Sequence, residues 1–266
     1  MLQKFLGDIL PPEGYYCLTL LPEGRHLWAD SLAELQTLVE RHAGREGVYY
    51  GTAAFQSHAN RKQANVLSLQ ALRLDIDAGP EKLAKHGEDA VYATQKQAVV
   101  AAAEFFKATE LVPTYLVSSG AGLHIYYCLD EAIDPEAWLS LAKGLSRLGA
   151  KHGLKIDASV TEDSARILRP IGALHGNGKR VAVLKDFGVK HSVAHLRSLL
   201  PVEDVLPKST RARTGINDDL DLTPSGPPSS AFKIVAHCGA LREVAVSRGD
   251  VPEPFWRAML GLVKRT

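Results

Sequence analysis

Two acidic residues stand in a stretch that otherwise has the pattern of a β-strand. The stretch is LRLDIDAG, residues 72–79, and its acids are Asp75 and Asp77. Successive side chains of a strand point to opposite faces, so the two carboxylates share one face and the leucine and isoleucine residues share the other. Carboxylate oxygens are ligands of Mg²⁺ and Mn²⁺, and two such acids can hold a pair of these ions. Alternatively, Asp77 only begins the turn that leaves the strand.

A second stretch, SSGAGLHIYY at residues 118–127, joins a turn of small residues to a strand that carries His124. Because glycine has no Cβ atom, the amides of Gly120 and Gly122 can approach a phosphate closely. His124 would then donate a hydrogen bond to a phosphate oxygen. The alternative is a tight hairpin turn followed by a histidine whose hydrogen bonds are satisfied inside the protein.

A third stretch, DASVTEDSARILRPIGALHGNGK at residues 157–179, supplies one more acid and three spaced cations. Asp157 would join the metal ligands, while Arg166, Arg169 and Lys179 would neutralise a triphosphate. By itself the stretch also fits a surface loop with scattered charges. The wider segment 164–213 holds ten basic residues against three acidic ones, in a chain whose net charge is only +1. This local charge suits a phosphate partner or a solvated basic face equally.

Hydrophobic periodicity and turn residues predict the elements that must position these side chains. They are a helix over 31–42, a strand-like run over 47–55, a polar loop over 56–65, a helix over 92–109, hairpin strands over 114–119 and 123–129, a helix over 135–151 capped by Asp134, and an extended segment over 155–160. The order is that of the split βαβ, or ferredoxin-like, α+β fold. Such a sheet packs helices on one face and leaves the other free. RRM-type modules bind RNA on that face with aromatic side chains, whereas this chain carries acids there.

Length and composition limit the organisation of the chain. With 266 residues, 45% of them hydrophobic, it can form one large domain and a small appendage. We expect a catalytic domain over 1–205, a linker rich in Ser, Thr and Pro over 206–230, and a small helical subdomain over 231–266. Neither a membrane-spanning run nor a signal-peptide pattern is present, which predicts a cytoplasmic protein without a membrane partner. Cys17, Cys128 and Cys238 form no CxxC pair, so no zinc site is expected.

The three stretches, in this order and spacing, resemble motifs I, II and III of the archaeo-eukaryotic primase superfamily, specifically the primase-polymerases of phages and plasmids. The resemblance covers about residues 47–185. It implies an RRM-like catalytic sheet beside an N-terminal αβ unit. It further implies a nucleotidyltransferase, a DNA primase or polymerase, that uses Mg²⁺ or Mn²⁺ to join NTP or dNTP substrates on a single-stranded DNA template. A replicative helicase, as a further domain or a partner, and the host-cell cytoplasm of a phage protein are implied as well.

The resemblance also assigns roles to single residues. It implies that Asp75, Asp77 and Asp157 are the catalytic, metal-binding acids. The residues it implies for nucleotide binding are His124, Ser118, Ser119, Gly120, Gly122, Arg166, Arg169, Lys179, Arg61 and Lys62. Many relatives read RLPGTxNxK where this chain reads RPIGALHGNGK, so Lys179 stands further along the chain than the lysine of those relatives.

Two other functions use part of the same residue set. A two-metal nuclease or other phosphohydrolase needs the acids, but it does not need the Gly-His hairpin or the spaced triphosphate cations. A non-catalytic RRM-like nucleic-acid-binding module of a replication initiator needs neither. The acids present in the first and third stretches argue against the binding module, and the combination of all three stretches favours the primase-polymerase.

Overall fold

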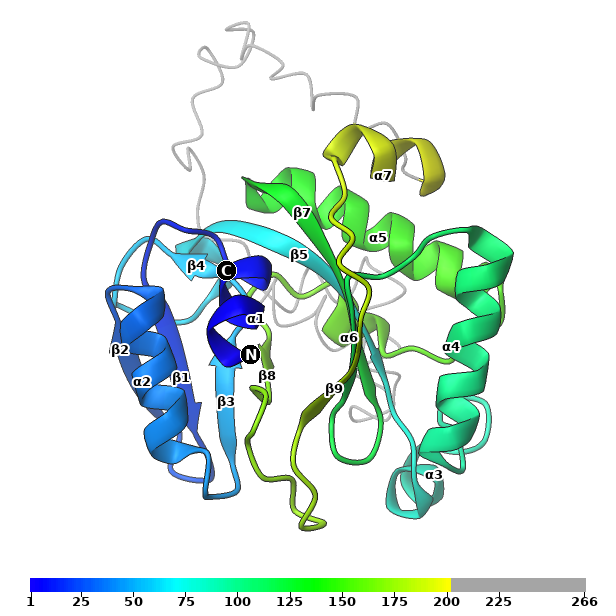
Figure 1. Cartoon of the computed structure of the whole chain (residues 1–266), viewed down its shortest axis with the longest axis horizontal. Helices are drawn as coiled ribbons and strands as arrows, with labels where there is room; N and C mark the ends of the chain where they lie inside the picture. The colour runs from blue at the N-terminus through cyan, green and yellow to red at the C-terminus, as the bar shows by residue number, and fades with distance from the viewer. Residues whose placement is uncertain (202–266) are drawn as a thin grey trace, which may run out of the picture. The chain divides into compact units, whose positions relative to one another are not determined.

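The computed structural model describes residues 1–201, which form two antiparallel β-sheets and their helices (Figure 1). The N-terminal sheet has the strand order β2-β1-β3-β8, and the larger sheet has the order β4-β5-β7-β6-β9. The strands are β1 Tyr16–Leu20, β2 Arg25–Ala29, β3 Val48–Gly51, β4 Ala54–Phe55, β5 Val66–Ile76, β6 Tyr115–Ser118, β7 Leu123–Ile133, β8 Ile167–Leu168 and β9 Ala182–Asp186. A mixed α/β architecture is therefore confirmed for this part of the chain.

Most of the helices begin at the capping residues that the sequence offers. Ser31, Thr94 and Asp134 each accept hydrogen bonds from the first backbone N–H groups of the helix that follows. The helices are α1 Leu2–Ile9, α2 Leu32–His42, α3 Pro80–His86, α4 Gln95–Thr109, α5 Pro135–Lys151, α6 Ala158–Thr161 and α7 Val193–Leu199, with a short 3₁₀ turn, η1, at Gln63–Asn65. The helices expected over 31–42, 92–109 and 135–151 are confirmed within a few residues, as is the β6–β7 hairpin.

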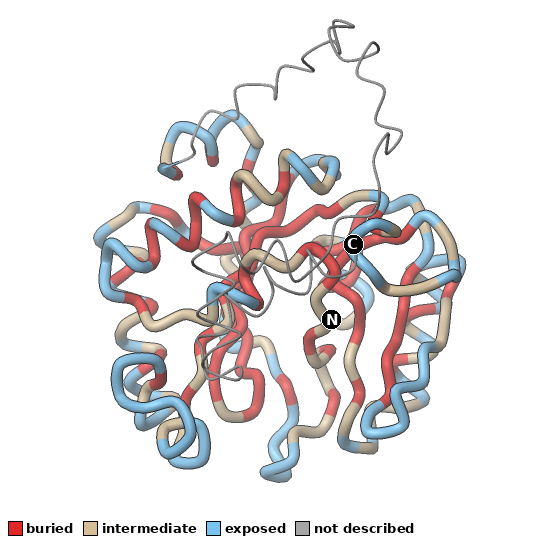
Figure 2. Tube along the Cα trace, turned by 180° about the vertical axis from the view of Figure 1, so that it is seen from behind, coloured by how far each residue is buried: buried red, intermediate tan, exposed pale blue. Residues whose placement is uncertain are grey.

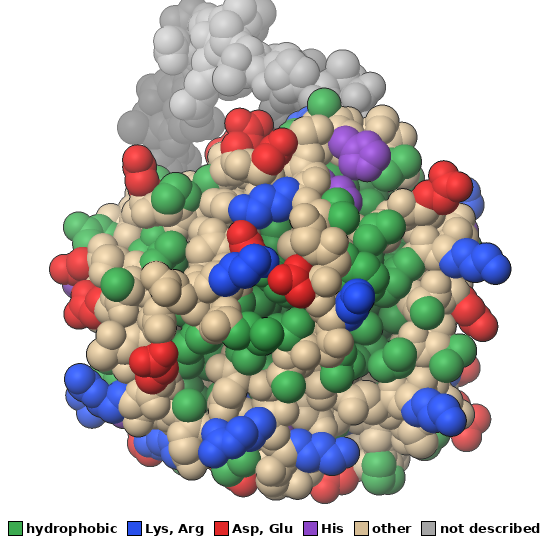
Figure 3. Space-filling model, in the orientation of Figure 1, with side chains coloured by type: hydrophobic (Ala, Val, Ile, Leu, Met, Phe, Trp, Pro, Cys, Tyr) green, Lys and Arg blue, Asp and Glu red, His purple; other side chains and the backbone are tan. Residues whose placement is uncertain are grey.

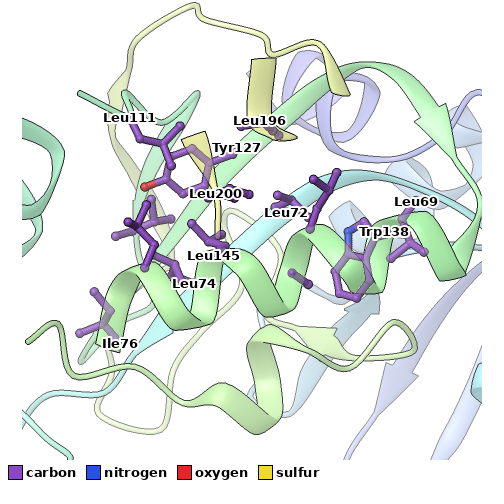
Figure 4. Packing of buried hydrophobic residues seen from close by; sticks show 14 of the residues in the cluster. Leu69, Leu72, Leu74, Ile76, Leu111, Tyr127, Trp138, Leu145, Leu196 and Leu200 are labelled. Carbon is purple, nitrogen blue, oxygen red and sulfur yellow. The ribbon is translucent and has the colours of Figure 1, made fainter. Parts of the chain in front are cut away.

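One face of β5 forms the main hydrophobic core with α4 and α5. Leu72, Leu74 and Ile76 point from β5 to this side, where they meet Trp138 and Leu145 of α5 (Figure 4). All five side chains are fully buried. Buried residues run along both sheets, while the outer surfaces of the helices are exposed (Figure 2). The alternation in LRLDIDAG thus places its apolar residues in the core, as predicted, and its acids on the opposite side.

The opposite face of this sheet is not free, which corrects the expectation from the strand pattern. A second core covers most of it, built from α1 and the N-terminal sheet on one side and from Tyr126 and Cys128 of β7 on the other. Arg73, which shares the face of the acids, is only 1% exposed. The N-terminal residues that cover the face lie far away in sequence, so the pattern of β5 alone did not reveal them. The end of the strand, at Asp75 and Asp77, opens into the cavity described below.

Two predicted strands are wrong in detail. Residues 155–160 form no strand, because the Asp157 carboxylate accepts the Val160 N–H and caps the helical turn α6 instead. The segment contacts β5 through one backbone hydrogen bond, from Asp157 N to Asp75 O at 3.0 Å. The run over 47–55 is divided between β3 and β4 in different sheets. Between the two strands, the backbone N–H of Thr52 and its hydroxyl both donate to Arg166 O, which continues the pairing of β3 with β8 by one residue.

The remaining organisational predictions reach beyond these residues. The linker over 206–230 and the helical subdomain over 231–266 lie outside the described residues, as does Cys238. Cys17 and Cys128 are buried free thiols. Among residues 1–201, every helix is too short or too polar to cross a bilayer.

Candidate active site

A cavity of about 550 Å³ opens where β5, the β6–β7 hairpin and the β8 strand of the N-terminal sheet approach one another. This volume lies within the range of about 300–1,000 Å³ that is usual for small-molecule sites. Its lining includes residues from all three motif stretches: Asp75, Asp77, Ser119, Gly122, His124, Arg166 and Arg169. Residues as far apart in sequence as Asp75 and Asn177 therefore share one cavity.

The acidic residues that line the cavity are Asp75 and Asp77 from the first stretch and Glu81 from α3. The Asp75 side chain is 17% exposed, and burial, followed by the charges of Asp77 and Asp157, raises its pKa to about 7. Asp77 is more open, at 26% exposed, and its Oδ2 lies 2.9 Å from Nζ of Lys82 on α3. The fold thus holds two carboxylates close together although their mutual repulsion is unfavourable, which is typical of a cation site.

Asp157 lies next to this pair but does not line the cavity. Its backbone N–H donates to Asp75 O, and its carboxylate accepts hydrogen bonds from Ser159 Oγ at 2.6 Å and from Val160 N at 3.3 Å. The expected meeting of three carboxylates around one cavity is therefore not what the structure shows, because two face the cavity and the third caps α6. Over residues 1–201, no group of three or more His, Cys, Asp or Glu side chains has the arrangement of a metal site.

The residues present nevertheless fit a divalent cation in part. Asp75 and Asp77 offer hard oxygen ligands, and a cation, the Lys82 ammonium, already lies in contact with Asp77. Burial, followed by the charges of Asp77 and Asp157, raises the pKa of Asp75, and a divalent ion would offset both effects. Asp157 would become a ligand only by turning its carboxylate away from the α6 N–H groups.

The glycines of the hairpin are needed for close packing. A Cβ atom on Gly122 would lie 2.0 Å from Ile76 O, and one on Gly120 would lie 2.5 Å from Cβ of His175. Both amides are already engaged, because Gly120 N donates to Ser118 Oγ at 3.4 Å and Gly122 N donates to Ser119 Oγ at 3.1 Å. Here these glycines bring β7 against β5 and the hairpin against the loop of His175. Ser119 lines the cavity, while Ser118 accepts a hydrogen bond from Gln95.

His124 lies directly across from Asp75 in the β5–β7 register. Its Nε2 is 3.6 Å from Asp75 Oδ1, which is too long for a hydrogen bond. Burial, together with the charges of Arg169 and Arg73, lowers the pKa of His124 to about 3, so the ring is neutral near pH 7. Its Nδ1 is buried and has no hydrogen-bond partner among the described residues. A neutral imidazole with an unsatisfied nitrogen is thus held at the edge of the cavity.

Arg166 and Arg169 place positive charge on the wall facing the acids. The Nε atoms of both are buried without a hydrogen-bond partner in residues 1–201. Arg169 stacks over the Tyr49 ring, with Cζ 4.9 Å from the ring centroid. Buried polar groups are normally paired, so two unsatisfied arginine donors at one cavity favour an anionic ligand.

Five of the expected nucleotide-binding residues do not line the cavity, namely Ser118, Gly120, Lys179, Arg61 and Lys62. Arg61 instead donates through Nη1 to Ala165 O, directly before Arg166, and the neighbouring Gln63 donates to Asp163 Oδ1 at 3.0 Å. Lys62 and Lys179 are exposed. The loop over 56–65 therefore holds the segment that carries Arg166.

Within the described part of the basic segment, residues 164–201, two cations pair with groups that do not line the cavity. Arg180 donates to the carbonyls of Gly172 and Ala43, and Lys190 pairs with Asp8 at 2.9 Å. On the face shown in Figure 3, basic and acidic side chains of the described residues are intermixed. The basic side chains that line the cavity are those of Arg166, Arg169 and Lys82.

Among the lining residues that sequence reasoning missed are Tyr49, Glu81, Lys82, His175 and Asn177. Asn177 Nδ2 donates to Gly120 O at 3.1 Å and so joins the third motif stretch to the hairpin. The Gly-Asn-Gly turn at 176–178 was a local signal for such a contact. Tyr49 and Lys82 carried no comparable signal, because their place depends on how distant elements pack.

Comparisons with known proteins return polymerases and primases by structure alone. The sequence matches no protein-family model and no curated protein. The AEP domain of the cyanophage S-2L primase-polymerase is similar over 71% of this chain and 90% of its own, with 16% identity and a TM-score of 0.48. The catalytic domain of primase RepB′, solved with initiator DNA, is similar over 74% and 89%, with 14% identity and a TM-score of 0.44.

A third similar structure is the polymerase domain of Mycobacterium tuberculosis Ligase D in complex with DNA. The similarity covers 73% of this chain and 82% of that domain, with 16% identity and a TM-score of 0.39. Because these TM-scores lie below 0.5, the likenesses assign no reaction to this chain, and its function is argued from the cavity.

Proposed function

We propose that this protein is a template-dependent nucleotidyltransferase, a DNA primase or polymerase, that binds a nucleoside triphosphate in the 550 Å³ cavity. The observation that carries the proposal is the pairing of two carboxylates, Asp75 and Asp77, with the unsatisfied cations Arg166 and Arg169 in one cavity. The divalent ions of a bound triphosphate would balance the two carboxylates, and its phosphates would pair with the two arginines. We also propose that β5, β6 and β7, in the order β5-β7-β6, form an RRM-like catalytic sheet, and that α4 and α5 are the helices of this unit.

The proposed reaction is nucleotidyl transfer from the bound nucleotide. A 3′ hydroxyl, of a primer or of an initiating nucleotide, gives up its proton to water and forms a bond to the α phosphorus. The bond between that phosphorus and the oxygen bridging it to the β phosphorus breaks, and pyrophosphate leaves. Divalent ions held by Asp75 and Asp77, with Asp157 as a further ligand, would activate the hydroxyl and stabilise the leaving group.

The chain's own residues orient the nucleotide and balance its charge. Arg166 and Arg169 would bind the β and γ phosphates. Their positive charges would stabilise the negative charge that develops on the leaving pyrophosphate. His124, being neutral, can supply one N–H donor to a phosphate oxygen without drawing charge from Asp75. Arg169 is held in place by Tyr49, so its guanidinium is ordered before the nucleotide binds.

A primer-extension assay tests this function. Wild-type protein, a primed single-stranded DNA template, dNTPs or NTPs and Mg²⁺ or Mn²⁺ should give products lengthened according to the template. Asp75→Asn should give none, and its circular dichroism spectrum should match that of the wild type. Shortened products that still depend on Asp75 would point to a metal-dependent nuclease instead. Binding of the template without any product would point to a nucleic-acid-binding module.

A further inference from the structure

Lys82 lies in the cavity but belongs to none of the three motif stretches. It stands on α3, the helix that starts three residues after Asp77, where Gly79 has a φ of +108° and turns the chain back toward the strand end. Its Nζ lies 2.9 Å from Asp77 Oδ2. The Lys82 side chain is 50% exposed and sits on a flexible stem, so it can leave this position without breaking any packing.

The ammonium of Lys82 occupies the kind of position that a metal ion would take. Asp77 is a ligand in the proposed function, and one of its oxygens is already paired with a positive charge. Lys82 also acts on Asp75. Its charge lowers the pKa of Asp75, whereas burial, Asp77 and Asp157 have larger effects that raise this pKa. A monovalent cation thus partly balances the carboxylate pair.

Resting on the proposed function, we propose that Lys82 is the counter-ion of Asp77 in the metal-free protein, that a divalent cation displaces it, and that the released ammonium then pairs with the phosphates of the bound nucleotide. A metal ion and an ammonium in contact with one carboxylate repel each other, so the two compete for Asp77. A polyphosphate in the same cavity offers the displaced ammonium a new partner.

This exchange couples metal binding to nucleotide binding. Without a nucleotide, the metal must displace Lys82 into water, which weakens metal binding. With a nucleotide present, Lys82 gains a phosphate partner, and the penalty on the metal falls. Removing the lysine charge should therefore tighten metal binding most when no nucleotide is present, and it should reduce the factor by which nucleotide and metal strengthen each other.

Titration calorimetry with Mn²⁺ on the full-length chain tests the exchange, with and without a non-hydrolysable dNTP. Lys82→Met should bind Mn²⁺ about fivefold more tightly than the wild type in the absence of nucleotide, as expected for an exposed ion pair. In the presence of nucleotide this difference should shrink or reverse. Lys85→Met removes the same charge from an exposed position of the same helix and should match the wild type under both conditions.

The outcomes separate this proposal from the proposed function. Unchanged or weaker Mn²⁺ binding by Lys82→Met without nucleotide would overturn the exchange, as would equal tightening in Lys85→Met. An absence of Mn²⁺ binding in wild type and Lys82→Met, with and without nucleotide, would overturn it too. Primer extension by the wild-type protein reports on the proposed function separately: if extension occurs while Mn²⁺ affinity does not respond to Lys82, only the exchange is wrong.

Discussion

Asp75 is held where the charged form of a carboxylate is disfavoured. Its side chain is largely buried, two other acids lie near it, and no hydrogen bond from His124 reaches it at 3.6 Å. Such a residue lowers the stability of the metal-free fold at neutral pH. Residues that lower stability in this way commonly serve binding or catalysis, which agrees with a role for Asp75 in the cavity.

The pH dependence of the free energy of unfolding should reveal that the ionised form of Asp75 is disfavoured in the fold. The pKa of Asp75 is raised from 3.8 to about 7 in the folded protein, so its contribution to the free energy of unfolding falls as pH rises between those values. His124 acts in the opposite sense, because its pKa is lowered from 6.5 to about 3 and its contribution rises with pH over that window. Asp75→Asn should therefore gain stability relative to the wild type between about pH 5 and pH 8, by at most a few kcal/mol.

Urea denaturation without divalent ions measures this difference. The exposed Asp89→Asn serves as the control and should follow the wild type at both pH values. A stability difference between Asp75→Asn and the wild type that is the same at both pH values would show that Asp75 titrates normally in the fold.

Loss of the second cavity acid should abolish synthesis without unfolding the protein. Asp77→Asn removes a carboxylate ligand but keeps the shape of the side chain, so primer extension should fall by at least about a hundredfold. Its partner Lys82 is half exposed and remains solvated, so the melting temperature should change little. Glu88→Gln, at an exposed position outside the cavity, is the matched control. Extension by Asp77→Asn at the wild-type rate would refute the role of this acid.

At the scale of elements, the contact between the hairpin and β5 sets the geometry of the site. Gly122→Ala would bring a Cβ atom to 2.0 Å from Ile76 O, so the hairpin must move away from β5 and carry His124 with it. We expect a loss of about 1–3 kcal/mol in the free energy of unfolding, together with reduced primer extension. Chemical denaturation of Gly176→Ala gives the comparison, because its nearest neighbour would be Glu46 Oε2 at 3.7 Å. Equal stability of both variants would contradict the close packing.

The elements that could be predicted from sequence are those with local determinants. The helices α2, α4 and α5 have caps and apolar periodicity within their own residues, and the β6–β7 hairpin has its glycine turn. The segment over 155–160 was misjudged, because the same Asp157 that suggested a strand end is a good helix cap. The burial of the acid face by α1 and the N-terminal sheet depends on residues far away in sequence, so no local pattern showed it.

The same distinction applies to the site. The spacing of Asp75, Asp77, His124, Arg166 and Arg169 within their motifs led to residues that do share the cavity. The side-chain direction of Asp157 depends on the α6 N–H groups, and the inclusion of Tyr49 depends on the packing of two sheets. These features follow from tertiary structure and are not encoded in the motif.

At the scale of the whole molecule, the N-terminal unit completes the cavity as well as covering the sheet. The loop over 56–65 holds the Arg166 segment through the hydrogen bond from Arg61 to Ala165 O. Arg61→Met removes this bond, so the arginine wall should become mobile and KM for the nucleotide should rise about tenfold, with a smaller effect on kcat. Lys62→Met, one residue away and exposed, should have the smaller effect on KM in steady-state kinetics. The reverse order would show that Lys62 contacts the nucleotide and that the Arg61 contact is dispensable.

The central claim is that Asp75 and Asp77 hold divalent cations beside a triphosphate that Arg166 and Arg169 bind. A crystal structure with Mn²⁺ and a non-hydrolysable dNTP, using the anomalous scattering of manganese, tests it most directly. We expect an anomalous peak in contact with both carboxylates, the phosphates against the two arginines, and the Asp157 carboxylate turned toward the metal. Manganese bound away from Asp75 and Asp77, or a nucleotide bound outside this cavity, would contradict the claim.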